Sequence, residues 1–457
     1  MKHIQYFLFL SLTAFMLYGC GLYSRYSRPE LDLLTDSLYR SAATHTDSAT
    51  IASKPWREFF TDSYLQTLIT IGIQRNADLD IARLQVEEAR AVLQQARLSY
   101  LPSISLTPQG SISRYNGDTK SVYNLGATAS WELDIFGRVT NTKRAALASL
   151  EQKRAYVQAV QTQLVATIAE SYYTLLMLDE QLDISNKTVA NWSETIATLE
   201  ALVLAGKSND VAVHQARASR SALEASIQTI RKSISETENA LSALLKEPAH
   251  TIERGTLGSQ HFSDDISVGL PLQLLSNRPD VRQAEAALAE AFYTTHVARA
   301  AFYPSLTLSG TVGWTNNGNG ATINPGKWLS SAIASLTAPL FDRGANKANL
   351  KVAKARQQEA VLQFEQSLLD AGNEVNNALT GWQTADRRIR FDEEQVADLE
   401  LAAEKTGLLV RYTSSTYLEV LTAQQSLLDA RLILAQDRVE KIQAIISLYH
   451  ALGGGVA

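Results

Sequence analysis

Cys20 is the residue whose chemistry can be read most directly, because it is the only cysteine and has no partner for an internal disulfide. It follows a short apolar run, residues 4–18, which comes after the basic Lys2. This run is shorter than the roughly 20 apolar residues of a membrane-crossing helix, and such a run is typical of a secretion signal. Residues 17–20 resemble a lipobox. We therefore expect a signal peptide over residues 1–19 and acylation of Cys20, with a stray cysteine inside the signal as the alternative.

The other residue types that carry out chemistry form no pattern of a catalytic or metal site. No two of the scattered histidines stand at metal-ligand spacing: His3, His45, His214, His250, His261, His296 and His450. No phosphate-binding glycine loop follows a strand, and Gly453–Gly455 is interpreted as a helix stop. We expect no enzyme activity, no cofactor and no metal. A net charge of −5 without long single-sign runs argues against nucleic acid as a partner.

An internal repeat organises the elements of the chain. Pro102 and Pro304 are 202 residues apart, and identities at this offset cluster in one short window: Asp78/Asp280, Ala82/Ala284, Glu88/Glu290, Ala89/Ala291, Ala96/Ala298, Arg97/Arg299, Ser103/Ser305 and Leu106/Leu308. Each half is therefore predicted to contain a helix, a Pro-Ser step and a strand, in this order.

After each of these prolines the hydrophobic period changes from helical to two. Every odd position from Tyr123 to Ile135 is apolar, and the even positions are small or polar. Residues 103–113 and 305–314 alternate in the same way, and residues 328–340 form a weaker fourth strand. Turn-prone stretches at 116–118 and 316–320 predict two hairpins.

These strands could belong to a sheet on a protein core or to a membrane β-barrel. Their length approaches the 9–11 residues of a membrane strand, which favours the barrel. Aromatic residues near the strand ends fit an interfacial girdle: Tyr100, Phe136, Phe302, Tyr303 and Phe341. Four strands cannot close a barrel, and open edges are costly in lipid, so several chains must share one barrel. Three copies would supply twelve strands.

The rest of the chain is predicted to be helical. Residues 140–205 contain neither glycine nor proline, and a spacing of three and four persists along them, as in a coiled-coil seam: Leu164, Ile168, Ser171, Leu175, Leu178, Leu182, Ser185, Val189, Trp192, Ile196, Leu199 and Val203. A turn follows at 206–210, with Asp210 as the expected N-cap, and a helix returns to about residue 246. The second half repeats this from about residue 345, with a turn at 413–416.

The predicted organisation follows from these elements. It comprises a signal peptide (1–19), an N-terminal anchored segment with a collar (20–65), a first helical segment (66–100), barrel hairpin 1 (101–137) and tunnel helical hairpin 1 (138–247). A second collar segment (248–276), a second helical segment (277–302), barrel hairpin 2 (303–342), tunnel helical hairpin 2 (343–450) and a tail (451–457) complete it.

Several motifs resemble those of the TolC-like outer-membrane factors, in particular the lipoprotein branch of multidrug efflux channels. They occur at residues 26–29, 56–79, 131–138, 278–285, 339–344 and 448–455, and so cover essentially the whole mature chain. The resemblance implies a mixed α and β membrane protein whose two-repeat protomer contributes four strands to a shared trimeric 12-stranded outer-membrane β-barrel. A long periplasmic α-helical coiled-coil barrel continues this pore.

The resemblance also implies partners and site residues. The homotrimer would receive substrates from an inner-membrane RND-type pump through a periplasmic adaptor, also called a membrane fusion protein. The adaptor would contact the hairpin tips, which contain Gly206, Lys207, Ser208 and Asn209 in one hairpin and Thr413, Ser414, Ser415 and Thr416 in the other. In resembling channels a leucine and acidic residues ring the constriction. The gate candidates here are Leu418, Glu419, Thr422 and Asp210. Thr422 stands where the family often has an aspartate.

Three functions are compatible with these features. The first is a passive exit duct for drugs or other small molecules, and the second is a duct of the same fold for protein secretion or heavy-metal export. The third is a coiled-coil scaffold tethered by Cys20, which leaves the four amphipathic strands unexplained.

Overall fold

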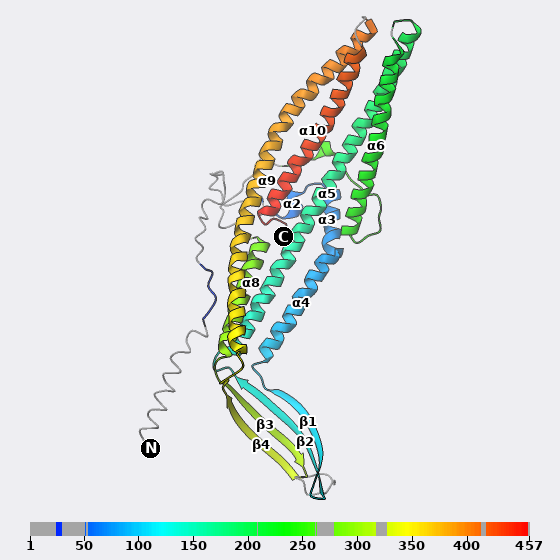
Figure 1. The fold of residues 1–457 in the computed structure, drawn as a ribbon. Coiled ribbons are helices and arrows are strands. Elements are labelled where there is room, and N and C mark those ends of the chain that lie inside the picture. Colours follow the sequence, from blue (N-terminus) through cyan, green and yellow to red (C-terminus); the bar gives the residue numbers. More distant parts are fainter. Residues whose placement is uncertain are drawn as a thin grey trace. The chain divides into compact units, whose positions relative to one another are not determined.

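A computed structural model describes residues 24–29, 51, 54–207, 209–260, 262, 278–316, 327–412 and 417–455. Cys20 lies outside the described residues. The chain divides into two compact units, the first formed around residues 84–155 and 282–367 and the second around residues 156–281 and 368–455. The long helices α5 (Arg138–Leu204) and α9 (Ala345–Tyr412) contribute to both units (Figure 1).

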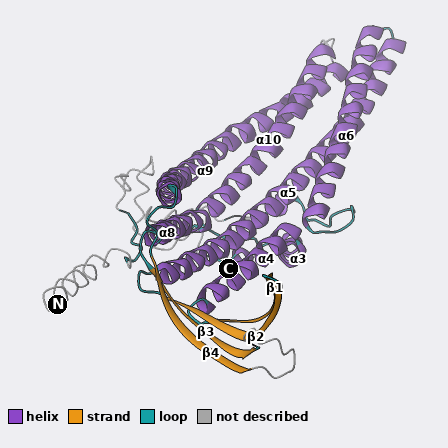
Figure 2. Cartoon of the chain, turned by 60° about the horizontal axis from the view of Figure 1, so that its bottom comes forward, coloured by secondary structure: helices purple, strands orange, loops and turns teal. Residues whose placement is uncertain are grey.

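The first unit contains one antiparallel sheet in the order β1-β2-β3-β4 (Figure 2). Its strands are β1 (Ser103–Tyr115), β2 (Asp118–Leu133), β3 (Ser305–Thr315) and β4 (Lys327–Thr337). The two predicted hairpins are confirmed, and β2 pairs with β3 to join them. The two edge strands, β1 and β4, are each paired on one side only among the described residues.

The pairing separates an apolar from a polar face, because residues that oppose each other across antiparallel strands share a face. Leu106 opposes Ala127, and Ala127 opposes Val312. The apolar face is not covered by the rest of the chain, since Ile112 is 80% exposed and Leu336 67%. A sheet on a protein core would bury this face, so the structure favours strands in contact with lipid.

The fourth strand differs from its prediction in two ways. β4 ends at Thr337 rather than at residue 340. Pro339 accounts for the early end, because it has no N–H for the ladder. Leu329 and Ile333 also lie on the polar face, opposite Gly313 and Ser309.

The spacing between the two repeats changes within the barrel hairpins. β3 begins 202 residues after β1, as predicted, whereas α9 begins 207 residues after α5. The second hairpin is therefore five residues longer than the first. Helices α6 (Asp210–Leu244) and α10 (Tyr417–Ala451) keep the larger offset.

A side-chain cap starts α5 directly after β2. Asp134 accepts hydrogen bonds from the N–H groups of Val139 and Thr140, each at 2.8 Å. Arg138 pairs with Glu132 at the end of the strand. A carboxylate at a helix N-terminus satisfies free N–H groups, so this junction ends the strand and begins the helix.

The second unit is built around a core that α2 (Trp56–Phe59), α3 (Ser63–Arg75), α5 and α10 share. Residues 66–100, predicted as one helical segment, contain the end of α3 and the whole of α4 (Ala77–Leu98). Asn76 separates the two helices. Its Oδ1 accepts from Leu79 N–H at 3.0 Å and its Nδ2 donates to Leu244 O at 3.0 Å, which explains the break.

The predicted coiled-coil seam of α5 is confirmed by burial. Ile168 and Leu175 are fully buried in the main core, and Trp192 and Ile196 belong to a second apolar cluster with Ala212 of α6. None of the described helices is long and apolar enough to span a membrane.

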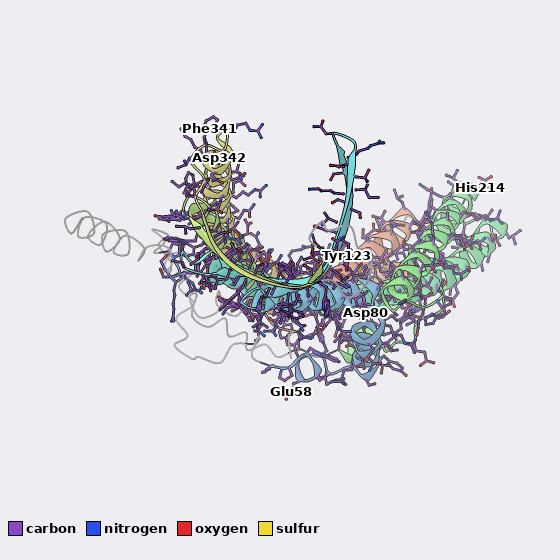
Figure 3. All side chains as sticks on the ribbon, turned by 90° about the horizontal axis from the view of Figure 1, so that it is seen from below. Glu58, Asp80, Tyr123, His214, Phe341 and Asp342 are labelled. Carbon is purple, nitrogen blue, oxygen red and sulfur yellow. The ribbon has the colours of Figure 1, made fainter. Side chains whose placement is uncertain are left out.

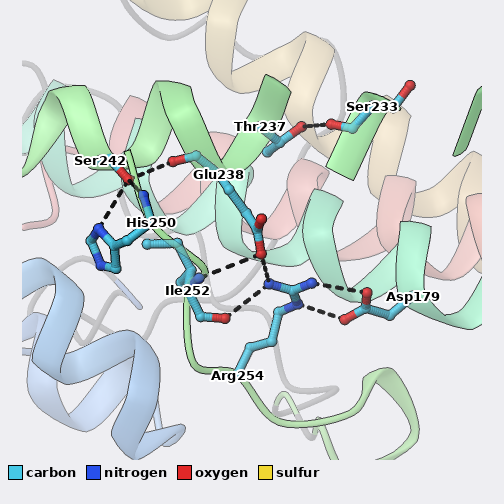
Figure 4. A network of polar contacts seen from close by, with 8 residues as sticks. All are labelled: Asp179, Ser233, Thr237, Glu238, Ser242, His250, Ile252 and Arg254. Atoms are coloured by element: carbon cyan, nitrogen blue, oxygen red, sulfur yellow. Dashed lines mark hydrogen bonds and ion pairs between the residues drawn. The ribbon is translucent and has the colours of Figure 1, made fainter. Parts of the chain in front are cut away.

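An arginine holds the described part of the predicted collar segment 248–276 against the second unit (Figure 4). Arg254 donates to Asp179 of α5 at 2.5 and 3.0 Å and to Glu238 of α6 at 2.6 Å. The two carboxylates raise the pKa of Arg254, so its charge is permanent. This bridge ties the loop to both helices of the first tunnel hairpin.

A pair of neighbouring carboxyl groups lies between α9 and α10. Asp437 is fully buried and Asp392 is half-buried, and the Oδ2 atoms of both are buried without a hydrogen-bond partner. Burial, followed by the neighbouring Asp392 carboxyl, raises the pKa of Asp437 to about 6, against the pull of Arg388. One shared proton would satisfy both carboxyl oxygens.

We expect this pair to make the stability of the α9–α10 hairpin depend on pH. Because its pKa is raised on folding, Asp437 contributes stability that is complete below its unfolded pKa and is lost as the pH rises through about 6. Asp437→Asn should remove this loss, which thermal unfolding between pH 5 and 8 would measure. Glu393→Gln, which removes an exposed carboxylate of the same hairpin, should keep the wild-type pH dependence. An unchanged pH dependence in Asp437→Asn would contradict the prediction.

Candidate gate and tunnel tips

The first tip begins with a helix C-cap of a defined type. Gly206 has φ +69°, its N–H donates to Val203 O at 3.0 Å, and Lys207 N–H donates to Leu202 O at 2.9 Å. These are the two bonds of a Schellman motif, which favours glycine because of the positive φ. Ser208 lies outside the described residues.

The return helix of the first tip starts one residue earlier than predicted. Asn209, with φ −102° and ψ 163°, occupies the N-cap position, and Asp210 is the first residue of α6. The prediction of Asp210 as the N-cap was therefore wrong. An exposed carboxylate in the first turn still stabilises the helix through its dipole.

The second tip is described only on its two sides, up to Tyr412 and from Tyr417. The predicted tip residues Thr413–Thr416 lie outside the described residues. On α10, Leu418 is 53% exposed, and Glu419 and Thr422 are exposed as well. Their spacing places the three side chains on one side of the helix, while Val420 and Leu421 are buried.

The gate candidates are thus brought together only in part. Leu418, Glu419 and Thr422 share the exposed face of α10. Asp210 belongs to α6, and no hydrogen bond or ion pair of the described chain joins it to them. No three metal-ligating side chains cluster anywhere in the described residues.

A cavity that the sequence did not reveal lies behind the first turns of α10. It has a volume of about 360 Å³ between α5, α9 and α10, and Tyr417, Val420 and Gln424 line it from α10. Gln424 donates to Thr195 of α5 at 3.1 Å, while its Oε1 is buried without a partner. Gln424 therefore lies on the wall of this cavity with a buried carbonyl oxygen that has no hydrogen-bond partner.

A second feature beyond the prediction is a strap, residues 24–29, which lies along α8 (Pro279–Ala300) in the first unit. Arg28 forms a bidentate pair with Glu285 at 2.8 and 2.6 Å, and Tyr26 N–H donates to the Tyr293 hydroxyl. Burial raises the pKa of Tyr26 to about 12. The sequence motif at residues 26–29 was recognised, but only the structure shows what it binds.

The four-stranded sheet with an uncovered apolar face and the two long helical hairpins define a class of outer-membrane channel proteins. The sequence profile described as outer membrane efflux protein matches residues 68–246 and 270–454, and the chain belongs to this family. It is an efflux channel of the outer membrane, as the sequence predicted.

Particular relatives match almost the whole chain. The cation efflux system protein CusC of Escherichia coli K12 is 31% identical over 453 residues, covering 97% of this chain and 98% of CusC. A solved structure of CusC has a TM-score of 0.86 at 30% identity, with 94% and 99% of the two chains covered. The probable outer membrane lipoprotein SilC of Salmonella typhimurium is 29% identical, with 97% of each chain covered. The open-state MtrE outer membrane channel of Neisseria gonorrhoeae has a TM-score of 0.85 at 29% identity, with 95% and 98% covered.

Proposed function

We propose that the chain forms the passive exit duct of a tripartite efflux system, as a homotrimer whose barrel is shared between copies. The observation that carries this proposal is the four-stranded sheet with two open edges and an exposed apolar face. In lipid, each unpaired backbone group of an edge costs several kcal/mol, so β1 of one copy must pair with β4 of another. Three copies supply twelve strands, enough for an open lumen.

The helical hairpins suit the periplasmic part of such a duct. α5 and α9 contain 67 and 68 residues, and at about 1.5 Å per residue each extends roughly 100 Å. A passage of this length can meet a periplasmic adaptor joined to an RND-type pump in the inner membrane. The tips at residues 206–209 and 413–416 are the proposed adaptor contacts, and the exposed face of Leu418, Glu419 and Thr422 is the proposed constriction.

The substrate class divides the proposal into two candidates. The resemblance to CusC, a cation efflux protein, favours export of toxic metal cations, whereas the lipoprotein efflux branch favours drugs. Deleting the gene and restoring it on a plasmid tests both. Lower tolerance to antibiotics and dyes indicates a drug duct, and lower tolerance to metal salts alone indicates a metal duct. Unchanged tolerance to every compound, with the native protein present in the parent outer membrane, would contradict efflux.

Acylation of Cys20 is proposed from the lipobox and is consistent with the lipoprotein relative SilC. Cys20→Ser should abolish incorporation of labelled palmitate, because the thiol that carries the lipid is lost. The matched control is Ser24→Ala, four residues further on, which should be labelled as the wild type is. Labelling of the Cys20→Ser protein would refute acylation at this residue.

A further inference from the structure

Four cations follow one another where α9 begins. Arg343 stands two residues before the helix, and Lys347, Lys351 and Lys354 lie in its first three turns. All four are exposed, and the spacing of four and three residues places the three lysines on one side of the helix. We call them the α9 stripe. Residues 345–358 contain no aspartate or glutamate. Two or three uncharged residues separate successive cations, so the stripe does not form a run of consecutive charges in the sequence.

The cations of the α9 stripe have no side-chain partner in the described chain, whereas cations at the start of the first repeat's long helix contact other residues of the chain. At the start of α5, Arg138 pairs with Glu132, Lys143 lies over the Tyr100 ring and Arg144 donates to Ser24 O. No side-chain hydrogen bond or ion pair within the described chain involves any member of the α9 stripe. Its charges are therefore available to a partner outside the chain.

The contact between α8 and α9 shows which side of the helix layer the stripe occupies. Thr295 of α8 donates to Ala353 O of α9 at 3.2 Å. Along an α-helix, each next residue is rotated by about 100° about the helix axis. Because α8 and α9 run antiparallel, this rotation places the next residue of both helices on the same side of the α8–α9 pair. On α8 the next residue is His296, which Ser24 of the strap contacts at 3.2 Å, and on α9 it is Lys354. The stripe therefore lies on the side of the strap.

The stripe begins where the chain leaves the membrane sheet. Phe341 and Asp342 lie at the end of α9 nearest the strands (Figure 3), and the neighbouring Leu340 is 98% exposed and Phe341 87%. Exposed apolar residues followed by a row of cations are typical of a lipid interface. The strap is the described segment that follows the proposed lipid anchor, Cys20, so we assign its side to the outside of the channel. There, the anions within reach of lysine side chains at this level are the phosphates of the periplasmic leaflet.

We propose that the α9 stripe binds the headgroups of anionic phospholipids, such as phosphatidylglycerol, at the periplasmic base of the barrel. Each copy offers a row of charges, with Arg343 nearest the strands and Lys354 about 10 Å beyond Lys347 along the helix. Attraction decays within a Debye length of about 8 Å, so Arg343 and Lys347 contribute most and Lys354 least. The lipid is held at the base of each second repeat, where the Asp342 carboxylate accepts hydrogen bonds from Gly344 N–H and Asn346 N–H at the start of α9 rather than from the stripe.

Lipid retention by the full-length trimer tests this proposal. Native mass spectrometry in detergent, with phosphatidylglycerol or phosphatidylcholine of the same acyl chains, gives the ratio of the two affinities. A charge near a lipid surface contributes about fivefold in affinity, so the wild type should prefer phosphatidylglycerol by tenfold or more. Lys347→Gln with Lys351→Gln and Lys354→Gln should lower this ratio severalfold and leave only the contribution of Arg343. High salt should likewise lower the ratio of the wild type.

The control variant removes a cation from a different face of the same helix. Arg356→Gln removes an exposed cation of α9 two residues beyond Lys354, outside the stripe, and should leave the ratio unchanged, whereas Lys351→Gln should lower it. No lipid preference in the wild type, or an equal loss in Arg356→Gln, overturns the proposal. Loss of the trimer mass in the triple variant would assign the stripe to the contact between copies. Equal competition by inorganic phosphate would indicate a free-anion site. Both of these results also overturn the proposal, and none of them depends on efflux.

Discussion

Replacing Leu418 and Glu419 together with alanine is expected to raise the single-channel conductance of the purified channel severalfold, with the trimer intact. Both side chains are exposed on α10 within its first turn, so neither holds the helix in its own chain. Around a threefold axis, three copies of each would narrow the lumen with an apolar and an acidic ring. Truncation to alanine widens both rings, and conductance in planar bilayers measures the result.

A matched double variant separates the constriction from general effects on α10. Asp429→Ala with Ile433→Ala removes the same kinds of exposed side chain from the same helix further from the tip, and it should conduct as the wild type does. Normal conductance of the Leu418→Ala, Glu419→Ala trimer would place the constriction elsewhere. Thr422→Asp, on the same face, should add a second acidic ring and therefore a block by divalent cations from the periplasmic side.

Gly313→Val is expected to prevent assembly of the barrel almost completely. Gly313 of β3 opposes Gly126 of β2, and a β-carbon at Gly313 would overlap the Leu125 carbonyl oxygen and lie 2.5 Å from Gly126 Cα. The obstacle is backbone in a paired strand, which cannot move aside without breaking the ladder. Overpacking of this kind costs about 3 kcal/mol or more, which is a large part of the stability of a typical domain.

Another strand glycine supplies the control for this substitution. Gly110 of β1 has nothing within 4 Å of the position that a β-carbon would occupy, so Gly110→Val should assemble normally. Heat-modifiable trimers from outer membranes, resolved by electrophoresis, measure the assembled fraction of each variant. Equal trimer yields from the two valine variants would show that the close approach at Gly313 is not needed for the barrel.

The repeat, the four strands and the long helices were predictable because each leaves a periodic signal within a short window. The alternation from Tyr123 to Ile135 and the seam from Leu164 to Val203 report local backbone geometry. The seam appears in the structure as predicted, and the alternating strand ends at Leu133, two residues earlier than predicted. The break at Asn76 was less visible. Its cause is partly local, the cap on Leu79, and partly remote, the bond to Leu244.

The candidate site was predicted at the level of residues but not of geometry. Leu418, Glu419 and Thr422 share an exposed face because they lie within five residues of one helix, which helical spacing alone implies. The cavity behind them needed the tertiary structure, since its lining residues on α5 are separated by about two hundred positions from those on α9 and α10.

The sequence by itself determined the class of protein, the two-repeat order of elements, the need for several copies and the absence of any catalytic pattern. Only the tertiary structure decided the β2–β3 register that brings Gly126 against Gly313, the position of Asp392 beside the buried Asp437, and the side of the α8–α9 pair on which the α9 stripe lies. The physical reason is that periodicity records how each segment folds against its own neighbours. Close contacts between segments depend on packing geometry. A glycine, an aspartate or a lysine is therefore written in the sequence in the same way whether or not another strand or helix lies against it.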